Sequence, residues 1–287
     1  MTDIDKKWIR NSFDHAANHY DAAAVLQREV ADRLDERLDV ILYEPKVILD
    51  IGSGTGYSAD LLRKRYPKAR VIELDIAHSM LKISRHKKSW LKRWRGNYQY
   101  LCADAEALPL ADQSVDMVFS SLAFQWCRSF GGLFEEIRRV LTPTGLLMFA
   151  YLGPDTLKEL RLSWAAVDKT RHVVEFVDMH DVGDDLLRAQ MVNPVMDMEY
   201  LTLTYGDVRE LMQDLKRLGS RNAMSGRQKG LTGKRKLSGM IQAYEQYRRN
   251  NVIPATYEVV YGHAWAPERV FDNTKNDFPI PVKLTTK

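Results

Sequence analysis

Three glycines at alternate positions, Gly52, Gly54 and Gly56, are the residues whose spacing most clearly points to chemistry. They follow an apolar, β-branched run at 47–51, in which Asp50 is the only acid. Such a run before a glycine-rich turn is typical of a buried parallel strand that ends at its ligand-facing edge. Glycine lets the backbone turn sharply and approach a ligand where a Cβ atom would clash. Apolar residues at helical spacing follow, so the segment predicts the first strand–turn–helix unit of a nucleotide-binding α/β sheet.

The spacing of the glycines narrows the class of ligand. A dinucleotide-binding fingerprint reads G-x-G-x-x-G and holds a pyrophosphate at the helix N-terminus, whereas this chain reads G-x-G-x-G after Asp50. No Lys-Ser or Lys-Thr pair follows, which argues against a P-loop. The pattern resembles the first motif of the class I S-adenosylmethionine-dependent methyltransferases. In that family the glycine turn faces the methionine and ribose portions of a ligand without phosphates.

Acidic residues stand at the ends of the next two expected strands. Asp75 closes the segment 70–75, where a carboxylate suits two hydrogen bonds to the ribose hydroxyls of an adenosine ligand, or alternatively caps the following helix. Asp104, followed by Ala105, ends the segment 98–103 and could accept the adenine amino proton or simply start a turn. Because the carboxyl ends of parallel strands share one edge, the glycines and both acids together predict an adenosine site.

Other residues expected at this site are weaker candidates. Met80 could place its thioether against the adenine ring, but methionine also commonly fills a core. The fourth expected strand leads into 120–126, a segment that would pass beneath the sulfonium. In it Ser121 is a candidate for cofactor binding, and Gln125 and Trp126 could shape the methyl-transfer chamber, although plain core packing is an alternative for Trp126.

Length and composition set limits on the class of protein. With 287 residues, 45% hydrophobic and 28% charged, the chain is long enough for one large α/β domain with a small insertion. The longest uncharged stretch, 140–154, is too short and too broken to cross a membrane, and charges near the N-terminus argue against a secretory signal. Two cysteines allow no disulfide framework, so we expect a cytoplasmic protein. Of the seven histidines only His15 and His19 have a ligand-like spacing, and without a third ligand we expect no metal.

The charge distribution is more informative than the net charge of +4, which does not imply nucleic acid. The stretch 82–95 holds seven Lys or Arg residues and no acid, and the stretch 227–236 holds five. Each could attract an acidic macromolecule. The alternative is a solvated helix face and a basic loop.

The pattern along the chain predicts a Rossmann-like α/β fold with a sheet of about seven mostly parallel strands. We expect an N-terminal helical segment at 1–45, a core at 46–153, a helical insertion with two closing strands at 154–265 that covers the ligand edge, and a loose tail at 266–287. The turn 142–145 is expected to end a helix and lead into the fifth strand. The expected strands are 47–51, 70–75, 98–103, 115–120, 146–151, 199–204 and 256–265, and the expected helices are 56–66, 78–94, 128–141, 155–168, 206–218 and 234–250.

The resemblance extends beyond the cofactor motif to one family. The segment 13–21, Phe-Asp-His-Ala-Ala-Asn-His-Tyr-Asp, resembles the N-terminus of the malonyl-acyl-carrier-protein O-methyltransferases of biotin synthesis. Further similar segments are 104–110, 121–127, 164–168, 215–219 and 255–258. The resemblance therefore covers about residues 10–265.

This resemblance implies a reaction and a set of residues. Members of that family use S-adenosylmethionine to methylate the free carboxylate of a malonyl thioester on acyl carrier protein. Tyr20 matches the active-site tyrosine of the family, with a tyrosine packed on the core as the alternative. Arg161 and Arg171 are candidates for binding the carboxylate, because an anion calls for a cation. Carrier proteins are acidic, so a basic stretch could dock one, and we expect a monomer that binds neither membrane nor nucleic acid.

Two other interpretations remain at this point. The segment 153–160 and the region through 255–257 also resemble a respiratory complex I assembly factor that acts on a protein arginine, although the context of Tyr20 favours the carboxyl methyltransferases. A cofactor-binding module without catalysis is the third interpretation. It is less favoured because every cofactor position is intact.

Overall fold

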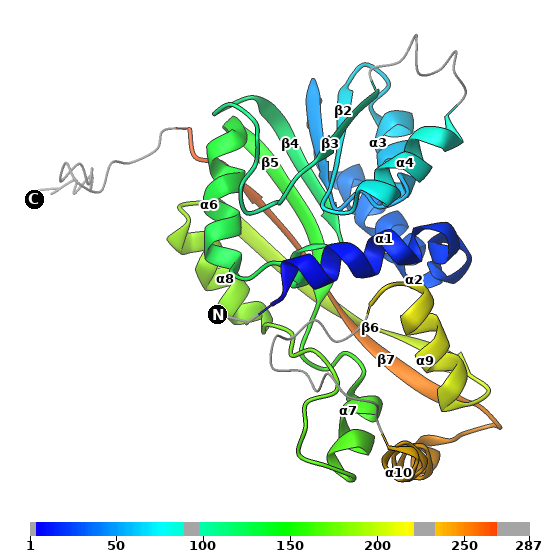
Figure 1. The fold of residues 1–287 in the computed structure, drawn as a ribbon. Helices are drawn as coiled ribbons and strands as arrows, with labels where there is room; N and C mark the ends of the chain where they lie inside the picture. The colour runs from blue at the N-terminus through cyan, green and yellow to red at the C-terminus, as the bar shows by residue number, and fades with distance from the viewer. Residues whose placement is uncertain (1–3, 89–97, 221–232, 269–287) are drawn as a thin grey trace, which may run out of the picture.

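The computed structural model describes residues 4–88, 98–220 and 233–268. Its centre is one sheet of seven strands in the order β3-β2-β1-β4-β5-β7-β6 (Figure 1). The strand order reverses between β1 and β4, and an open α/β sheet binds its ligands at such a point. The strands are β1 (Val47–Ile51), β2 (Arg70–Asp75), β3 (Tyr98–Cys102), β4 (Val115–Ser121), β5 (Leu141–Leu152), β6 (Val192–Tyr205) and β7 (Ile253–Trp265).

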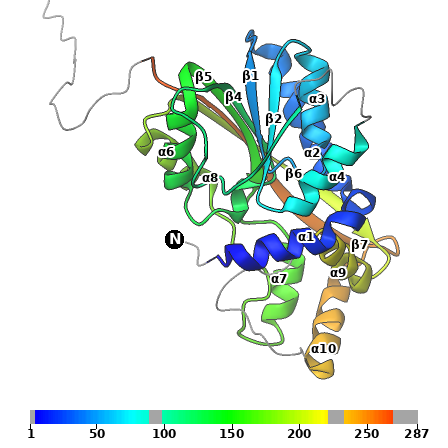
Figure 2. The ribbon, with the colours of Figure 1, turned by 45° about the horizontal axis from the view of Figure 1, so that its top comes forward.

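The first five strands are parallel and form the half of the sheet that the glycine motif predicts. Strands β1 and β4 are almost wholly buried, because helices cover both faces of the sheet. On one face lie α2 (Val25–Glu36), α3 (Tyr57–Arg65) and α4 (His78–Lys87), and on the other lie α6 (Phe130–Val140) and α8 (Met179–Arg188) (Figures 1 and 2). The two faces bury separate apolar clusters, one including Ile48 and the other including Leu49.

The two closing strands reverse direction. Strand β7 is antiparallel to β5, and β6 pairs antiparallel with β7 at the edge of the sheet. The connection from β5 to β6 contains α7 (Lys158–Ala165) and α8, and the connection from β6 to β7 contains α9 (Val208–Arg217), α10 (Lys234–Tyr244) and the short 3-10 helix η3 (Glu245–Tyr247). The helices α7, α9 and α10 gather beyond the carboxyl edge of the parallel strands (Figure 1).

The N-terminal segment forms α1 (Lys6–Ala23), followed by α2 and a 3-10 helix, η1 (Arg37–Val40). Asp5 begins α1 by accepting a hydrogen bond from the backbone N–H of Trp8. Helix α1 crosses the carboxyl edge of the parallel strands, between the sheet and the group of α7 and α9 (Figures 1 and 2). It therefore forms a wall over the edge where the sequence predicts a ligand.

The predicted seven-stranded, mostly parallel fold is confirmed, with differences in detail. The expected strand at 199–204 is much longer, from Val192 to Tyr205, because its whole length pairs with β7. Between the expected helix 155–168 and this strand, where no helix is expected, the chain forms α8, whose buried face consists of only Val182 and Leu186. The turn at 142–145 lies within β5 as an irregularity in its pairing with β4.

Other predictions reach beyond the described residues. Helix α4 is described to Lys87, so most of the expected continuation to 94 lies outside the described residues, as does nearly all of the expected tail. Within residues 4–88, 98–220 and 233–268, none of the helices combines the length and the apolar character that crossing a membrane requires.

Candidate functional site

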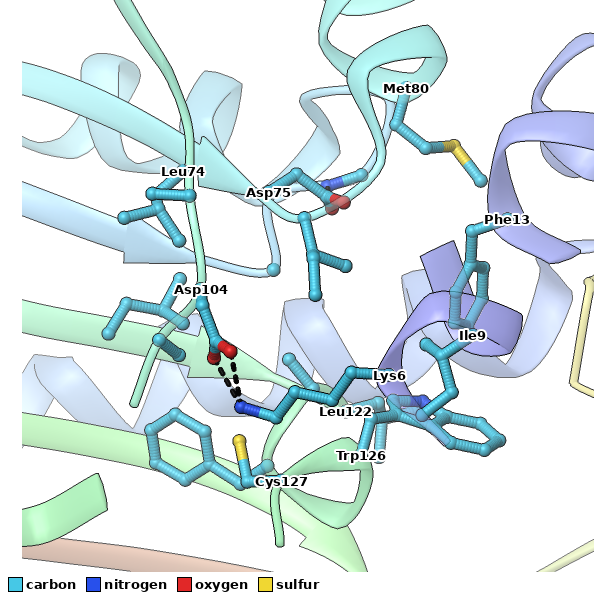
Figure 3. Close-up of a pocket in the computed structure, with 18 of the residues that line it drawn as sticks. Lys6, Ile9, Phe13, Leu74, Asp75, Met80, Asp104, Leu122, Trp126 and Cys127 are labelled. Carbon is cyan, nitrogen blue, oxygen red and sulfur yellow. Dashed lines mark hydrogen bonds and ion pairs between the residues drawn. The ribbon is translucent and has the colours of Figure 1, made fainter. Parts of the chain in front are cut away.

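A cavity with about 750 Å³ of empty space opens at the carboxyl edge of the sheet, beneath α1 (Figure 3). We call it the cofactor cavity. Its walls come from the ends of β1 to β4 and from the inner face of α1. The lining residues are Lys6, Ile9, Phe13, Tyr20, Ile51, Gly52, Gly54, Leu74, Asp75, Ile76, Met80, Ala103, Asp104, Ala105, Ser121, Leu122, Ala123, Phe124, Trp126 and Cys127.

The glycine turn has a backbone that only glycine adopts without strain. Gly52 has φ +72°, and a Cβ atom added to it would overlap the Cβ of Ala123 after β4. Gly56 has φ +87° and packs against the Ser84 hydroxyl of α4. Gly52 lines the cavity, whereas Gly56 packs on α4 behind the turn and does not line it.

Asp75 is held by the backbone at the end of β2. One carboxylate oxygen accepts the Gly54 N–H at 2.9 Å and the other accepts the Ala77 N–H at 2.7 Å. The side chain lines the cavity although the residue is only 8% exposed. Burial raises the pKa of Asp75 to about 6, against the lowering effect of the two backbone hydrogen bonds. The carboxylate is therefore fixed in place and still has acceptor capacity for a ligand.

Asp104 has a partner that the sequence did not predict. The Lys6 Nζ, at the start of α1, lies 2.5 Å from both Asp104 carboxylate oxygens and also pairs with Glu106 (Figure 3). Burial alone lowers the pKa of Lys6, but hydrogen bonds to the two acids outweigh it and raise the pKa. The ammonium therefore ties the N-terminal end of α1 to the loop after β3.

Two more acids fasten α1 along the cavity. Asp14 accepts the Ser79 N–H at 2.7 Å, at the start of α4. Asp21 accepts the Thr55 hydroxyl at 2.5 Å, in the glycine turn, and pairs with Lys87 at 2.6 Å. Sequence analysis assigned no role to these acids, because the residues that they bind are far away in the chain.

A second cavity, which we call the acyl chamber, lies on the other side of Tyr20 and has about 760 Å³ of empty space. It extends between α1, α2, α7, the loop after α7, and the end of α9. Phe13, Tyr20, Leu122 and Trp126 line both cavities, so the two spaces adjoin at these side chains. The other residues of the chamber are Leu26, Gln27, Gln125, Leu152, Thr156, Leu157, Leu160, His172, Val173, Val174, Phe176, Leu215, Leu218, Ser220 and Tyr257.

Tyr20 is placed to act at the junction of the two cavities. Burial, with the negative charges of Asp75 and Asp21, raises the pKa of its phenol well above the usual value. The phenol therefore keeps its proton near neutral pH. Within the described parts of the chain its hydroxyl makes no hydrogen bond, so this donor is available to a ligand.

Several other expected residues also lie at the cavities. Met80, Ala105 and Ser121 line the cofactor cavity, where the buried Ser121 hydroxyl has no hydrogen-bond partner among the described residues. Trp126 packs edge-on against Phe13, with ring centroids 5.6 Å apart.

Gln125 lies in the acyl chamber and not in the cofactor cavity. Its Nε2 donates to the Leu122 carbonyl at 2.7 Å, whereas its Oε1 is buried without a described partner. The fixed amide therefore presents an unused acceptor at the chamber.

Besides Gly56, three expected residues lie away from both cavities. Asp50 is buried behind the glycine turn, where neither carboxylate oxygen has a hydrogen-bond partner among the described residues. Burial, together with the nearby charge of Glu73, raises its pKa far above the usual value. Arg161 donates to the Thr156 carbonyl at 3.3 Å, and the exposed Arg171 pairs with Glu175 at 2.7 Å. Neither arginine lines the acyl chamber.

Two cations in the described half of the basic stretch 82–95 are engaged within the protein, whereas Lys82 and Arg85 are exposed. Lys87 pairs with Asp21 and donates to the Thr55 carbonyl, and Lys88 is buried against Asp60. Most of the stretch 227–236 lies outside the described residues. In the parts of the chain that the structure describes, no group of three or more His, Cys, Asp and Glu residues could hold a metal.

The cofactor cavity fits the adenosyl and methionine portions of S-adenosylmethionine. Asp75 presents a backbone-fixed carboxylate suited to a ribose diol, Asp104 lies one strand further along, and the unpartnered Ser121 hydroxyl faces the same space. The absence of a side chain at Gly52 lets Ala123, after β4, pack directly against the glycine turn.

Comparisons with known proteins agree with this fit. The family model described as "Methyltransferase domain" matches residues 49–149. The fold is similar to that of the YcgJ protein of Bacillus subtilis, with a TM-score of 0.59, 15% sequence identity, and coverage of 84% of this chain and 99% of that one. A phosphoethanolamine N-methyltransferase of Haemonchus contortus in complex with S-adenosylhomocysteine gives a TM-score of 0.55 at 13% identity, over 90% of this chain and 60% of that one. At these identities the likeness establishes the fold.

Sequence relatives establish the family. A malonyl-[acyl-carrier protein] O-methyltransferase of Gallionella capsiferriformans is 54% identical over 266 residues, which are 92% of each chain. A protein of the same name from Laribacter hongkongensis is 54% identical over 92% of this chain and 90% of its own. One from Coxiella burnetii is 42% identical over 98% and 95%, respectively. The chain belongs to the malonyl-[acyl-carrier protein] O-methyltransferase family, a family of S-adenosylmethionine-dependent methyltransferases.

Proposed function

We propose that the chain methylates the free carboxylate of a malonyl thioester carried on acyl carrier protein, an early step of biotin synthesis. The observation that carries the proposal is the composition of the acyl chamber. Among the described residues that line it there is no acid, so no carboxylate repels an anionic substrate and none acts as a base. The chamber also adjoins the cofactor cavity through the side chains of Tyr20 and Trp126.

A carboxylate nucleophile suits a chamber without a base. Carboxyl groups have pKa values of about 4, so the malonyl group is ionised at neutral pH and has no proton to lose. When bound, S-adenosylmethionine supplies an electrophilic methyl group on a positively charged sulfur. The protein then needs to hold the two reactants in line and to keep water out, and the mostly apolar lining of the chamber does the latter.

Tyr20 is the residue that we propose to position the substrate. Its phenol keeps its proton because burial raises its pKa, so it donates a hydrogen bond to a substrate oxygen and does not abstract a proton. Trp126 and Phe13, packed edge-on, close the junction from the other side. An aromatic face next to the junction also favours a positively charged sulfur.

For the cofactor we propose roles that follow the geometry of the strand ends. Asp75 binds the ribose hydroxyls, Asp104 accepts from the adenine amino group, and the Gly52–Gly54 turn with Ser121 receives the methionine portion. Met80 and Ala105 contact the adenine ring. Asp50 and Gly56 support the turn from behind.

We further propose that the acidic carrier docks on a groove between α1 and α9. The groove is lined by Trp8, Asn11, Ser12, His15, Ala16, His19, Gln213, Lys216 and Arg217, which include cations and no acid. The end of α9 also lines the acyl chamber, through Leu215 and Leu218, so a carrier at this groove is next to the chamber. The enzyme acts as a cytoplasmic monomer in this proposal.

The proposed reaction is tested by incubating the protein with S-adenosylmethionine and malonyl-acyl carrier protein and measuring the intact mass of the carrier. The expected result is a mass gain of one methyl group on malonyl-acyl carrier protein and no gain on acetyl-acyl carrier protein, which has no free carboxylate. A carrier of unchanged mass would refute the proposal.

The role of Tyr20 is tested with Tyr20→Phe, which removes the hydroxyl and keeps the ring. We expect kcat to fall about 10–100-fold, the effect of losing one hydrogen bond to a charged group, with unchanged affinity for S-adenosylhomocysteine. Full turnover by the variant would exclude the tyrosine hydroxyl from the reaction.

The relatives favour this substrate over a protein arginine. Those at 48–54% identity are all named malonyl-[acyl-carrier protein] O-methyltransferases, and the acyl chamber has no described acid that could pair with a guanidinium.

A further inference from the structure

We infer that His172 binds the free carboxylate of the substrate in the acyl chamber and so selects a malonyl group over an uncharged acyl group. This inference rests on the proposed function, because it assigns the recognition of the same substrate to one residue. No sequence motif pointed to His172.

The composition of the chamber singles out this residue. Among the described residues that line the chamber, His172 has the only basic side chain. Arg161 and Arg171, the cations expected from the sequence, do not line it. A carboxylate taken from water into a largely apolar space needs a charged or hydrogen-bonding partner, because leaving it unpaired is costly.

The surroundings of His172 fix its ring. The imidazole stacks on the Trp164 ring, with centroids 3.8 Å apart and planes 12° apart. Its Nε2 lies 2.9 Å from the Asp168 carboxylate, and the other Asp168 oxygen lies 3.0 Å from the Lys236 ammonium of α10. The imidazole side chain is 14% exposed and the Asp168 side chain 10%. Such second-layer contacts hold a binding residue in one orientation.

This arrangement determines which nitrogen is free. Hydrogen bonds from Lys236, then from His172 and the Thr170 N–H, lower the pKa of Asp168, so its carboxylate is ionised. The ionised carboxylate therefore accepts a hydrogen bond from the Nε2–H group of His172. The Nδ1 atom is then the nitrogen left for the substrate. It donates a hydrogen bond to a carboxylate when the ring is an imidazolium, since both nitrogens then carry protons.

The charge balance is consistent with one anionic guest. With His172 protonated, the group of Lys236, Asp168 and His172 has a net charge of +1, which one malonyl carboxylate neutralises. The titratable groups that face the imidazole are Asp168, from the turn after α7, and Lys236, from α10. Across the chamber lie the phenols of Tyr20 on α1 and Tyr257 on β7, and burial raises the pKa of both, so they remain neutral.

Neutral polar groups complete the chamber. The Oε1 atoms of Gln27 and Gln125 are buried and have no hydrogen-bond partner among the described residues. As acceptors they cannot hydrogen-bond to the carboxylate or the thioester carbonyl of the substrate, which have no proton to donate. Selection for the charged end of the substrate therefore falls to His172.

The test compares binding of malonyl-carrier and acetyl-carrier protein to the complex with S-adenosylhomocysteine, in which no methyl transfer occurs. The wild-type protein is expected to prefer the malonyl form. His172→Gln, which keeps a hydrogen-bond donor for Asp168 but cannot carry charge, is expected to lose about 10–100-fold of that preference, the range for a charged hydrogen bond. KM for malonyl-carrier protein is expected to rise by a similar factor, with a smaller change in kcat.

Two further variants serve as controls. One tests whether a folding defect causes the loss of preference, and the other tests whether removing any nearby cation causes it. His172→Phe keeps the stacking on Trp164 without a charge and is expected to lose the same preference. Arg171→Gln removes an exposed cation outside the chamber and is expected to retain it. Unchanged affinity for S-adenosylhomocysteine and an unchanged Tm show that each variant is folded.

The outcomes separate this inference from the proposed function. If the wild-type protein methylates malonyl-carrier protein and both His172 variants keep the full malonyl preference, the inference is wrong and the proposed function stands. If the wild-type protein neither methylates the malonyl carrier nor prefers it, both are wrong.

Discussion

The cofactor cavity and the acyl chamber adjoin at Tyr20, yet they are built in different ways. The cofactor cavity takes its polar groups from the ends of neighbouring parallel strands, where the backbone itself fixes the side chains, as it does for Asp75 through Gly54 and Ala77. Among the described residues, the acyl chamber takes its one basic group, His172, from a loop that Trp164 and Asp168 hold in place. The ends of the sheet strands position the polar groups of the cofactor cavity. Packing between the loops and helices that connect the strands positions those of the acyl chamber.

This difference has a functional meaning. A sheet edge can be kept across proteins that share a cofactor, whereas loops can vary with the substrate. Helix α1 belongs to both sites, since its Lys6 contacts the cofactor cavity and its Tyr20 lines both. The comparison predicts that substitutions which move the backbone weaken cofactor binding in the first site. It also predicts that substitutions which change charge alter the binding of the carrier substrate to the second.

The largest effect is expected for Gly52→Ala. Its φ of +72° and the overlap of an added Cβ atom with Ala123 leave no room for the substitution without moving the strand ends. We expect affinity for S-adenosylhomocysteine, measured by calorimetry, to fall at least about 100-fold.

Gly132→Ala is the matched control, because a Cβ atom at this helical glycine would contact nothing within 4 Å. It is expected to bind normally. Equal affinities of the two variants for S-adenosylhomocysteine would show that cofactor binding tolerates movement of the strand ends. The proposed contrast between the two sites would then be wrong.

A smaller effect is expected for Asp75→Asn. An amide can accept only one of the two backbone hydrogen bonds that the carboxylate receives, and it has no charge, so we expect affinity for S-adenosylhomocysteine to fall about 10–50-fold. Normal affinity of the variant would exclude Asp75 from the ligand contacts.

The same residue predicts the pH dependence of binding. The pKa of Asp75 is raised to about 6 by burial in the free protein, and hydroxyl donors from a ribose favour the ionised form. Binding therefore releases a proton below about pH 6. Affinity should rise with pH up to about 6, by up to about tenfold per pH unit, and level off above it. In Asp75→Asn this dependence should disappear, and a wild-type affinity that stays constant from pH 5 to 7 would contradict the assignment.

The contrast between the sites also explains what sequence analysis could predict. Local sequence patterns predict the ends of the strands, the glycine turn, Asp75 and Asp104. The spacing of apolar residues and the turn-forming residues together specify where each strand ends. Trp126 was predicted from its place after the fourth expected strand. Tyr20 was reached only through the family resemblance, since nothing local distinguishes it from a core aromatic.

The remaining residues depend on contacts between distant segments. Lys6 binds Asp104, which lies 98 residues further along the chain, and no local sequence pattern predicts such a contact. The carboxylate was assigned to Arg161 or Arg171 by charge alone, but each has a different partner, Thr156 and Glu175 respectively. His172 became visible only when packing placed it in the chamber.

The smallest effect is expected at the groove between α1 and α9. The exposed side chain of Lys216 has no ion-pair partner within the described ranges, and Arg217 has only a distant one, Asp214 at 3.6 Å. Reversing both charges, in Lys216→Glu with Arg217→Glu, should raise KM for malonyl-carrier protein about 3–10-fold at low salt, because rim charges act mainly through long-range attraction. The effect should fade at high salt.

The matched control reverses Lys64 and Lys68, which are exposed near the C-terminal end of α3, at the opposite edge of the parallel strands. The two double variants change the net charge equally, so only the position of the charge differs. An equal rise in KM for both would mean that the carrier responds to overall charge and that the groove is not its docking site. A rise confined to the Lys216 and Arg217 variant would place the carrier beside the end of α9, whose Leu215 and Leu218 line the acyl chamber.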